Sequence, residues 1–409
     1  MEDGATRITI ASRLFPPEPG AAAYRLGRLA AGLSRHGARV RVLTTLPPRS
    51  VRTRAVAGLD RDTRSGTPGA VTVRRWPVLR DSGGNVRGYI QFASFDGPLL
   101  ARLLGTRSDL VVVEPPPTTG VAVRLVSRVK RIPYVYYAAD VSSTAAAGIG
   151  INPAIVRVLT RVESWVMRGA AHVLAVSEGV ATEVRALGVD PARVTVVGTG
   201  VDTDTFQPQA SPDDQDVATL VYAGTMSEIH GAEVFVRAFG RIAAEHPGAE
   251  LVMLGQGTER ADLERLADSL APGRVRFEGL VAAERVAQVL GSARAGLASV
   301  RPGKGYDFSF PTKMFASTAC GTPVIYAGVG PGATVVREND LGWAVDWDEA
   351  AVAEAMTMAL ARPVPAARRA DLARWTTANA SQDSVSERAV AAVLGVLHRA
   401  EEPFGDHGR

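Results

Sequence analysis

The chain has 409 residues, of which 46% are apolar and 22% are charged, so it is long enough for two globular domains whose cores need no disulfides. The formal net charge is only +4, and the basic residues are not interleaved with aromatic ones, which argues against nucleic acid as a partner. The single cysteine, Cys320, cannot form an internal disulfide, and we expect it to be a small buried residue rather than a nucleophile.

The N-terminus carries no basic region followed by an apolar run, and no uninterrupted apolar stretch reaches membrane-spanning length. We therefore expect a cytoplasmic protein without a signal peptide or transmembrane segment, although the sequence does not exclude peripheral contact with a membrane. Only three of the 46 basic residues are lysines, namely Lys130, Lys304 and Lys313. A chain that otherwise uses arginine can need a compact ammonium at such a place, although chance explains the same distribution.

The first half of the chain begins with a strand, a glycine-containing loop, a helix and a second strand. RITIAS (7–12) and ARVRVLTT (38–45) are the strands, and the helix between them ends at Gly37. This order predicts the start of a doubly wound parallel sheet. We expect Gly20 at the floor of a cleft, near donor phosphate or acceptor; the alternative is tight packing of the helix start against the strand.

Three further strands follow at 71–79, 109–114 and 132–141, with helices at about 88–104 and 119–129. Residues 50–70 are expected to form a mobile loop. Glu114 and Asp140 both stand at the carboxyl ends of strands, where open parallel sheets bind ligands. We favour a functional role for Asp140 more than for Glu114, and for each the alternative is helix capping or loop hydrogen bonding.

The stretch AAAGIGINPA (145–154) is predicted to be a lid or acceptor loop, and Asn152 is predicted to cap a helix over 153–168. A strand, a helix and a last strand lead to Asp202-Thr203-Asp204, which we interpret as a turn. The polar segment FQPQASPDDQD (206–216) marks the end of an N-terminal domain over 1–207.

The second half repeats the alternation of strands and helices. TLVYAGT and AELVMLG are the first strands, and GWAVDWD resembles the final one. We expect a second domain over 208–380 and a C-terminal helix over 381–409.

The stretch from Ser299 to Val336 has the composition of a diphosphate site. An arginine- and lysine-bearing loop is followed by a helix, a buried strand and a second glycine-rich loop that opens another helix. Cations and helix N-termini are what a diphosphate requires. The candidate ligands are Arg301, Lys304, Thr312, Lys313, Gly330, Gly332 and Ala333. For Arg301 the alternative is a loop ion pair, and for Lys304 and Lys313 it is a solvated surface lysine.

Several segments resemble glycosyltransferases of family 4, which have the GT-B fold. FPPEPGAAAYRLGRLAAGLSRHGARVRVLT is similar to the first glycine loop and helix of that family, and AHVLAVSEGVATEVRALGVDPARVTVVGTGVDTDTF to its interdomain segment. VYAGTMSEIHGAEVFVRAF and PTKMFASTACGTPVIYAGVG resemble its donor-side segments, in the style of bacterial cell-surface and amino-sugar transferases. The resemblance implies an α/β protein with two Rossmann-like doubly wound domains facing a central cleft. It makes 1–207 the acceptor-side domain and 208–380 the nucleotide-sugar-binding domain, with the helix over 381–409 returning to the N-terminal domain. It also implies a retaining transfer without a metal or other cofactor.

The sequence departs from that family at charged positions. The arginine and lysine usual in the first loop of the second domain correspond to Thr225 and His230 here. The two glutamates of the family, spaced E-x7-E, fall near Phe308 and at Ala316, and a later glutamate falls at Thr334. The resemblance places recognition of the base, uracil or guanine, on the main chain near Gly255, Gly279 and Leu280. His230 can donate to a phosphate; a surface histidine is the alternative.

We predict a glycosyltransferase that uses a nucleoside diphosphate sugar and a small-molecule or lipid-linked acceptor, in glycan or specialised-metabolite biosynthesis, as a monomer or homodimer. Asp140, Lys313 and Arg301 are the residues expected at the reacting groups. The missing glutamates leave two alternatives: a protein of this fold that binds a sugar nucleotide or partner without transfer, or a transferase with a thiol or amine acceptor. A pyridoxal-dependent phosphorylase is disfavoured because lysine is scarce.

Overall fold

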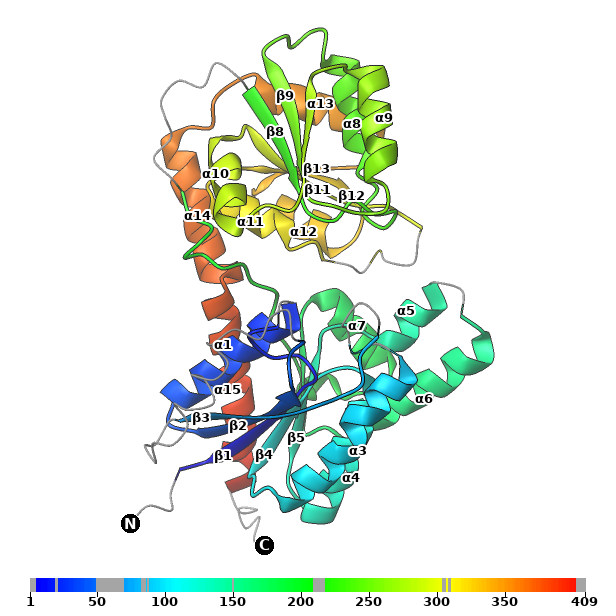
Figure 1. Cartoon of the computed structure of the whole chain (residues 1–409). Helices are drawn as coiled ribbons and strands as arrows, with labels where there is room; N and C mark the ends of the chain where they lie inside the picture. The colour runs from blue at the N-terminus through cyan, green and yellow to red at the C-terminus, as the bar shows by residue number, and fades with distance from the viewer. Residues whose placement is uncertain are drawn as a thin grey trace, which may run out of the picture. The chain divides into compact units, whose positions relative to one another are not determined.

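The computed structural model describes residues 5–18, 21–48, 70–81, 86, 88–148, 151–208, 218–303, 307 and 310–401. The chain divides into two compact units, residues 1–198 with 385–409 and residues 199–384 (Figure 1). The sequence had placed the corresponding ends at 207 and 380. The C-terminal segment from Val385 belongs to the first unit.

The first unit is built on a parallel sheet of seven strands in the order β3-β2-β1-β4-β5-β6-β7. Ile8 in the first strand is paired with Val40 on one side and Leu110 on the other. The strands are β1 (Arg7–Ala11), β2 (Arg39–Thr45), β3 (Val71–Trp76), β4 (Leu110–Val113), β5 (Tyr134–Ala138), β6 (His172–Ala175) and β7 (Val194–Val196).

Helices cover both faces of this sheet (Figure 1). On one face, α1 (Ala21–Arg35) and α15 (Gln382–Glu401) share a core through Leu29, Leu33, Val390 and Val393. On the other face, α3 (Tyr89–Gly105), α4 (Pro117–Lys130), α6 (Pro153–Gly169) and α7 (Glu178–Ala186) bury their apolar residues against the strands. The long apolar runs in β4 and β5 follow from this burial on both sides.

The segment predicted as a lid is in part helical. A short helix, α5 (Ser142–Gly148), occupies its first half, and residues 149–150 lie outside the described residues. The carboxylate of Glu163 in α6 accepts hydrogen bonds from the backbone N–H groups of Ser142 and Ser143, both at 2.8 Å, and so fixes the start of α5. The prediction for Asn152 is confirmed, because its side chain accepts from the Ala154 N–H at 2.9 Å.

The second unit has a parallel sheet of six strands in the order β10-β9-β8-β11-β12-β13. Its strands are β8 (Ala218–Ala223), β9 (Ala249–Leu254), β10 (Val275–Glu278), β11 (Ala295–Val300), β12 (Val324–Gly328) and β13 (Gly342–Val345). Its helices are α8 (Glu233–Ile242), α9 (Arg260–Leu270), α10 (Ala283–Ser292), α11 (Lys313–Ala319), α12 (Pro331–Glu338), α13 (Glu349–Leu360) and α14 (Ala366–Ala380). The sequence analysis did not predict α14.

Both sheets reverse their winding direction once, between β1 and β4 in the first unit and between β8 and β11 in the second. Ligands of open parallel sheets bind outside the carboxyl ends of the strands at such a point. The predicted α/β fold of two Rossmann-like sheets is thus confirmed, and it gives each unit one natural binding edge. No helix in the described part of the chain is long and apolar enough to cross a membrane.

Candidate functional site

The loops at the switch point of the second sheet are held together by main-chain contacts. The Arg301 N–H, just after β11, donates to the carbonyl of Ile229 at 2.8 Å. The hydroxyl of Ser299 in β11 donates to the carbonyl of His230 at 2.5 Å. The loop that follows β8 is therefore fixed against the end of β11, and its side chains have defined positions.

Lys313 carries its ammonium into this switch point from the first position of α11. Its Nζ donates to the Tyr222 hydroxyl at 2.6 Å and lies 4.0 Å from the centre of the same ring. The Tyr222 hydroxyl in turn donates to the carbonyl of Thr225 at 2.7 Å. A β carbon on Gly224 would lie 3.0 Å from Lys313 Cε, so a glycine is needed for the lysine stem to pass.

The environment of Lys313 disfavours its charge. Burial lowers the pKa of this amine from 10.5 to about 7. Within the described residues no carboxylate lies at ion-pair distance from the ammonium. Lys313 as a whole is only half-buried, but its amine is surrounded by protein atoms, so an anion bound here would stabilise the charged form of the amine.

His230 lies beside this amine, where the sequence analysis expected a phosphate-binding group. Burial, and then the charge of Lys313, lower the pKa of His230 to about 4, so the imidazole is neutral near pH 7. Its Nδ1 lies 2.9 Å from the Ser227 hydroxyl. When that hydroxyl donates to Nδ1, the Nε2–H is available as a neutral donor.

Arg301 is already paired. Its Nη1 lies 3.0 Å from Glu233 Oε1 in the first turn of α8, and its guanidinium stacks 4.9 Å from the Trp347 ring centre. The Trp347 Nε1–H donates to the carbonyl of Gly231 at 3.1 Å. The structure thus contains the loop ion pair that was the alternative for Arg301. Binding of a phosphate by this residue stays a prediction.

The loop after β9 packs directly on the loop after β8 and is joined on its other side to the end of β10. A β carbon on Gly255 would lie 2.2 Å from the Gly224 carbonyl oxygen, and one on Gly257 would lie 1.9 Å from that of Met226. Arg260 donates to the carbonyls of Gly255 and Glu278 at 3.0 and 3.2 Å and so joins the two strand ends. An open hollow of about 670 Å³ is lined here by Gln256, Gly257, Thr258 and Arg260.

Two predicted base contacts, Gly279 and Leu280, follow β10. Leu280 is 78% exposed, so its apolar side chain is not packed into the core. The Gly255 N–H donates to the carbonyl of Glu278 at 3.1 Å, so these positions stay close to the end of β9.

The start of α12 supplies backbone donors at the end of β12. Gly330 precedes the helix with φ of 90°, and the first-turn N–H groups of Gly332 and Ala333 have no carbonyl one turn earlier to bind. A β carbon on Gly332 would lie 2.4 Å from the Tyr326 ring, so only glycine allows this packing. Since β12 neighbours β11, these donors lie at the same sheet edge as the Lys313 amine.

The first unit has its own polar cluster at the switch between β1 and β4. Ser12 donates to Glu114 Oε1 at 2.6 Å, and Arg25 Nη2 in α1 lies 3.1 Å from Glu114 Oε2. Glu114 is therefore buried and hydrogen-bonded, which is the alternative that the sequence analysis gave for this residue. Asp140 stands at the end of β5 without a hydrogen bond to any described residue. Asp140 as a whole is exposed. Desolvation of its carboxylate by the surrounding protein nevertheless raises the pKa of this group, and the nearby positive charge of Arg25 opposes that rise.

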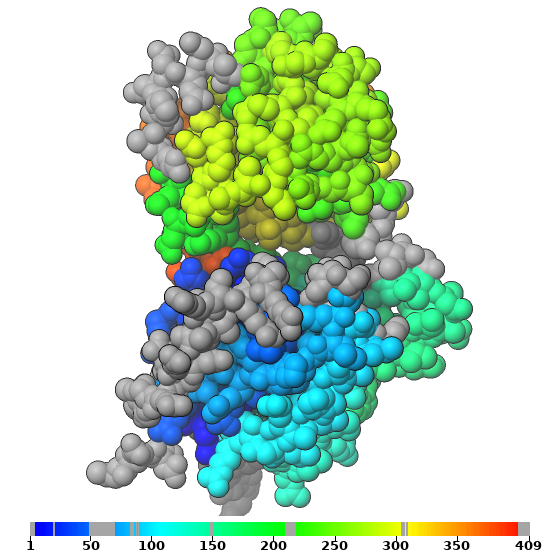
Figure 2. Space-filling model, viewed as in Figure 1, coloured from blue at the N-terminus to red at the C-terminus, as the bar shows by residue number. Residues whose placement is uncertain are grey.

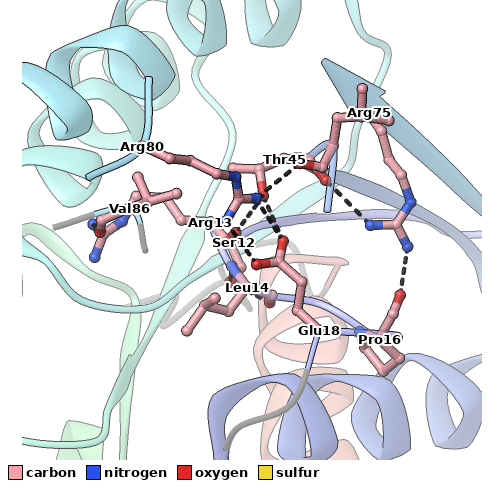
Figure 3. Close-up of polar contacts among 10 residues, drawn as sticks. Ser12, Arg13, Leu14, Pro16, Glu18, Thr45, Arg75, Arg80 and Val86 are labelled. Atoms are coloured by element: carbon pink, nitrogen blue, oxygen red, sulfur yellow. Dashed lines mark hydrogen bonds and ion pairs between the residues drawn. The ribbon is translucent and has the colours of Figure 1, made fainter. Parts of the chain in front are cut away.

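A second cluster fixes the loop after β1, as Figure 3 shows. The carboxylate of Glu18 receives both terminal nitrogens of Arg80 at 3.0 Å and the Thr45 hydroxyl at 2.9 Å. Nearby, Arg13 donates to the Val86 carbonyl at 3.0 Å, and burial lowers its pKa to about 10. These contacts join residues far apart in sequence, and no sequence pattern marked them.

Some predicted positions cannot be compared with the structure. Gly20, Lys304, Phe308 and most of residues 50–70 lie outside the described residues. Thr312 is exposed and precedes α11, whereas Ala316, where the family has a glutamate, is packed into the core beside Phe315. The Asp202 carboxylate accepts from the Asp204 N–H and the Thr205 hydroxyl, which confirms the predicted turn. Nowhere in the described ranges are three His, Cys, Asp or Glu side chains grouped to hold a metal ion.

One repeated pattern in the sequence pointed to the missed residue Tyr222. The sequence Tyr-Ala-Gly occurs at the carboxyl ends of both β8 and β12, at 222–224 and 326–328, although β8 itself ends at Ala223. In each case the tyrosine hydroxyl donates to the carbonyl three residues later, from Tyr222 to Thr225 and from Tyr326 to Val329. Within the described residues, only the Tyr222 hydroxyl also accepts a hydrogen bond from a lysine, Lys313.

Comparison with known proteins identifies the two halves separately. Residues 20–200 match the glycosyl transferase 4-like domain, and residues 217–362 match glycosyl transferases group 1. The D-inositol 3-phosphate glycosyltransferase of Acidothermus cellulolyticus is 29% identical over 57% of this chain and 55% of its own length. The chain thus spans about half the length of the curated relatives it matches.

Solved structures share the whole fold at low sequence identity. HepE of Anabaena, in complex with UDP and glucose, superimposes with a TM-score of 0.66 at 16% identity, covering 95% of this chain and 99% of its own. Sucrose-phosphate synthase of Thermosynechococcus elongatus superimposes with a TM-score of 0.70 at 17% identity, covering 97% and 98%. With two matched domains in the family's order and both sheets in its fold, this chain belongs to the GT-B glycosyltransferases of the family 4 type.

Proposed function

We propose that the protein transfers a sugar from a nucleoside diphosphate sugar to an acceptor, and that Lys313 binds the diphosphate. The observation that carries the proposal is the buried Lys313 ammonium, which has a tyrosine hydroxyl but no carboxylate beside it among the described residues. A diphosphate supplies the missing negative charge. The neutral Nε2–H of His230 and the free N–H groups of Gly332 and Ala333 are further donors at the same sheet edge.

The chemistry asked of these groups is stabilisation of the leaving group. When the bond between the anomeric carbon and the phosphate oxygen breaks, its electron pair goes to that oxygen, and negative charge grows on the diphosphate. The Lys313 ammonium strengthens its interaction as this charge grows, which lowers the barrier. The acceptor's nucleophilic atom bonds the anomeric carbon and its proton passes to the departing phosphate oxygen, while the Lys313 ammonium is proposed to take the charge-stabilising part that a metal ion plays elsewhere.

UDP is the first nucleotide to test, because the HepE structure of the same fold contains UDP. Main-chain groups near Gly255 and Gly279, with the exposed Leu280 side chain, are proposed to hold the base. On the acceptor side, the carboxylate of Asp140, which makes no hydrogen bond to a described residue, is proposed to hydrogen-bond the acceptor. Arg301 is a weaker candidate than Lys313 for the diphosphate because Glu233 already neutralises it.

A binding protein without transfer activity is the second candidate. It is favoured by one observation, the buried Ala316 at the place of a family glutamate. The two functions share the nucleotide site, so they differ only in turnover. Release of nucleoside diphosphate from a bound nucleotide sugar, with or without acceptor, separates them.

The experiment that tests the proposal is differential scanning fluorimetry with UDP, GDP, dTDP and ADP, followed by calorimetry for any nucleotide that raises the melting temperature. We expect one diphosphate to stabilise the protein and Lys313→Ala to abolish that stabilisation. Absence of a shift with all four nucleotides, in protein shown to be folded, contradicts the proposed donor site. Stabilisation that Lys313→Ala leaves unchanged removes Lys313 from it.

A further inference from the structure

The outer faces of α4 and α6 in the first unit combine exposed apolar side chains with unpaired arginines. The two helices pack side by side, and their outward residues meet where Arg124 stacks 4.1 Å above the Trp165 ring. In Figure 2, α3 and α4 form the cyan surface, and the teal residues of α5 and α6 lie beside it. We propose that this α4–α6 face is a docking surface for an anionic lipid bilayer.

The apolar part of the face has no partner within the described chain. On α6, Ile155 and Val158 are 49% and 58% exposed, and their spacing of three puts them on one side of the helix. On α4, Leu125 and Val129 are 45% and 74% exposed. Trp165, at 40%, stands on α6 in contact with Arg124 of α4, and an indole is well suited to the boundary between water and lipid.

The α6 helix explains why these side chains are uncovered. Its apolar stripe is buried only in its second half, where Val166 and Met167 pack against the strands. Its first half, from Pro153 to Thr160, buries no residue at all. Ile155 and Val158 lie on the flank of α6, beside the buried stripe and not on it, so they are available to another apolar phase.

The charge of the face has one sign. Arg128, Arg157 and Arg161 are exposed, and none forms an ion pair with a carboxylate of the described residues. α4 contains no acidic residue, and the single one of α6, Glu163, is buried and binds the start of α5. Two exposed arginines of the second unit differ from these, since Arg265 and Arg374 pair with Asp262 and Asp371.

This combination selects a lipid surface over other occupants. A second copy that docked symmetrically through this face would oppose arginine to arginine, which is repulsive. Nucleic acid would use the arginines but would gain nothing from Ile155, Val158 and Val129. Anionic headgroups bind the guanidinium groups while the apolar side chains and Trp165 enter the acyl boundary, so the bilayer alone uses every exposed group.

The test is sedimentation of the full chain with vesicles of phosphatidylcholine alone and of equal parts phosphatidylcholine and phosphatidylglycerol. We expect binding to the second composition only, and a loss of binding at about 1 M NaCl, where the Debye length is ~3 Å. Arg157→Glu combined with Arg161→Glu should weaken binding at least tenfold, and so should Ile155→Ser combined with Val158→Ser. All four positions are exposed, so the fold should persist, and circular dichroism checks this.

Matched controls come from the second unit. Arg265→Glu combined with Arg374→Glu changes the net charge by the same amount, and Met358→Ser removes an apolar side chain of 47% exposure. These variants should bind as the unmodified protein does. Failure of the unmodified protein to bind anionic vesicles overturns the proposal. Equal loss in the control variants, or self-association through the α4–α6 face in size-exclusion chromatography, overturns it as well.

Discussion

Replacing Lys313 by methionine should weaken binding of the donor and at the same time stabilise the empty protein. Methionine keeps an unbranched apolar stem against Tyr222 and Gly224 but removes the charge. A charge-assisted hydrogen bond contributes ~1.5–3 kcal/mol, so the dissociation constant for the nucleoside diphosphate should rise about 10- to 100-fold. Isothermal titration calorimetry measures this directly.

The methionine variant should be more stable than the unmodified protein when the site is empty, because the pKa of Lys313 is lowered in the folded state. Its value of about 7 in the folded protein lies below the 10.5 of the unfolded chain, so between these values the unfolded state binds more protons. Stability attributable to this group therefore rises with pH across that window and is lowest below pH 7, where the buried amine is charged. At about pH 6 the methionine variant should melt at a higher temperature than the unmodified protein, and the difference should shrink as pH rises.

Proton uptake links the two effects. A diphosphate prefers the charged amine, so the affinity of the unmodified protein should fall about tenfold per pH unit above pH 7, until the pKa of the complex is reached. The methionine variant should lose that slope. A dissociation constant that is independent of pH between about 7 and 9, or equal in both proteins, would refute the assignment of Lys313 to the diphosphate.

Lys130 offers a control of the same type with a different expected result. Its ammonium, in the first unit, donates to the carbonyls of Leu103 and Leu104 at 3.2 and 3.3 Å near the end of α3. Lys130→Met should lower the melting temperature, because it leaves carbonyls without their donor, and should leave nucleotide affinity unchanged.

Three further outcomes are expected. Tyr222→Phe keeps the ring under the lysine but removes the hydroxyl that joins Lys313 to Thr225, so it should weaken nucleotide binding several-fold. Tyr326→Phe removes the equivalent hydroxyl on β12 and should leave nucleotide binding unchanged. Gly257→Ala should lower both the melting temperature and the nucleotide affinity, because the new β carbon would lie 1.9 Å from the Met226 carbonyl oxygen. Gly97→Ala in α3 is the control: its β carbon would meet no atom within 4 Å, so this variant should be as stable as the unmodified protein or more stable. Asp140→Asn should reduce transfer at least tenfold with nucleotide affinity unchanged, and equal transfer rates would exclude Asp140 from the acceptor site.

The fold was predictable because its signals are local. The alternation of β-branched runs with helical spacing, and the glycines between them, is enough to indicate two doubly wound sheets. The prediction missed α14, which has an amphipathic pattern too weak to recognise and buries only Leu372, Thr376 and Ala380. It also assigned residues 145–148, which belong to α5, to a loop, because the Glu163 carboxylate that holds the start of that helix comes from another helix.

The site was predictable to a smaller extent, because its chemistry depends on partners that are distant in sequence. Composition and a family resemblance were enough to single out Lys313 and His230. Neither could show that Glu233, 68 residues before Arg301, neutralises it, nor that His230 is kept neutral by burial. Charge compensation is a property of three-dimensional neighbours, so a list of cations in a loop overstates the positive charge that a ligand meets.

The pairing of Arg301 and the isolation of Lys313 also explain why a chain so rich in arginine uses lysine at this position. An arginine stays charged at every accessible pH and would carry the full cost of an unpaired charge while the site is empty. A lysine can release its proton in the empty site, where its pKa is about 7, and regain it when an anion arrives. Lys313→Arg should therefore lower the melting temperature of the empty protein, and its planar group would meet Gly224 and the Tyr222 ring where the lysine stem now passes. An arginine variant that is as stable as the unmodified protein would show that the site tolerates a permanent cation, and the case for a titrating lysine would fail.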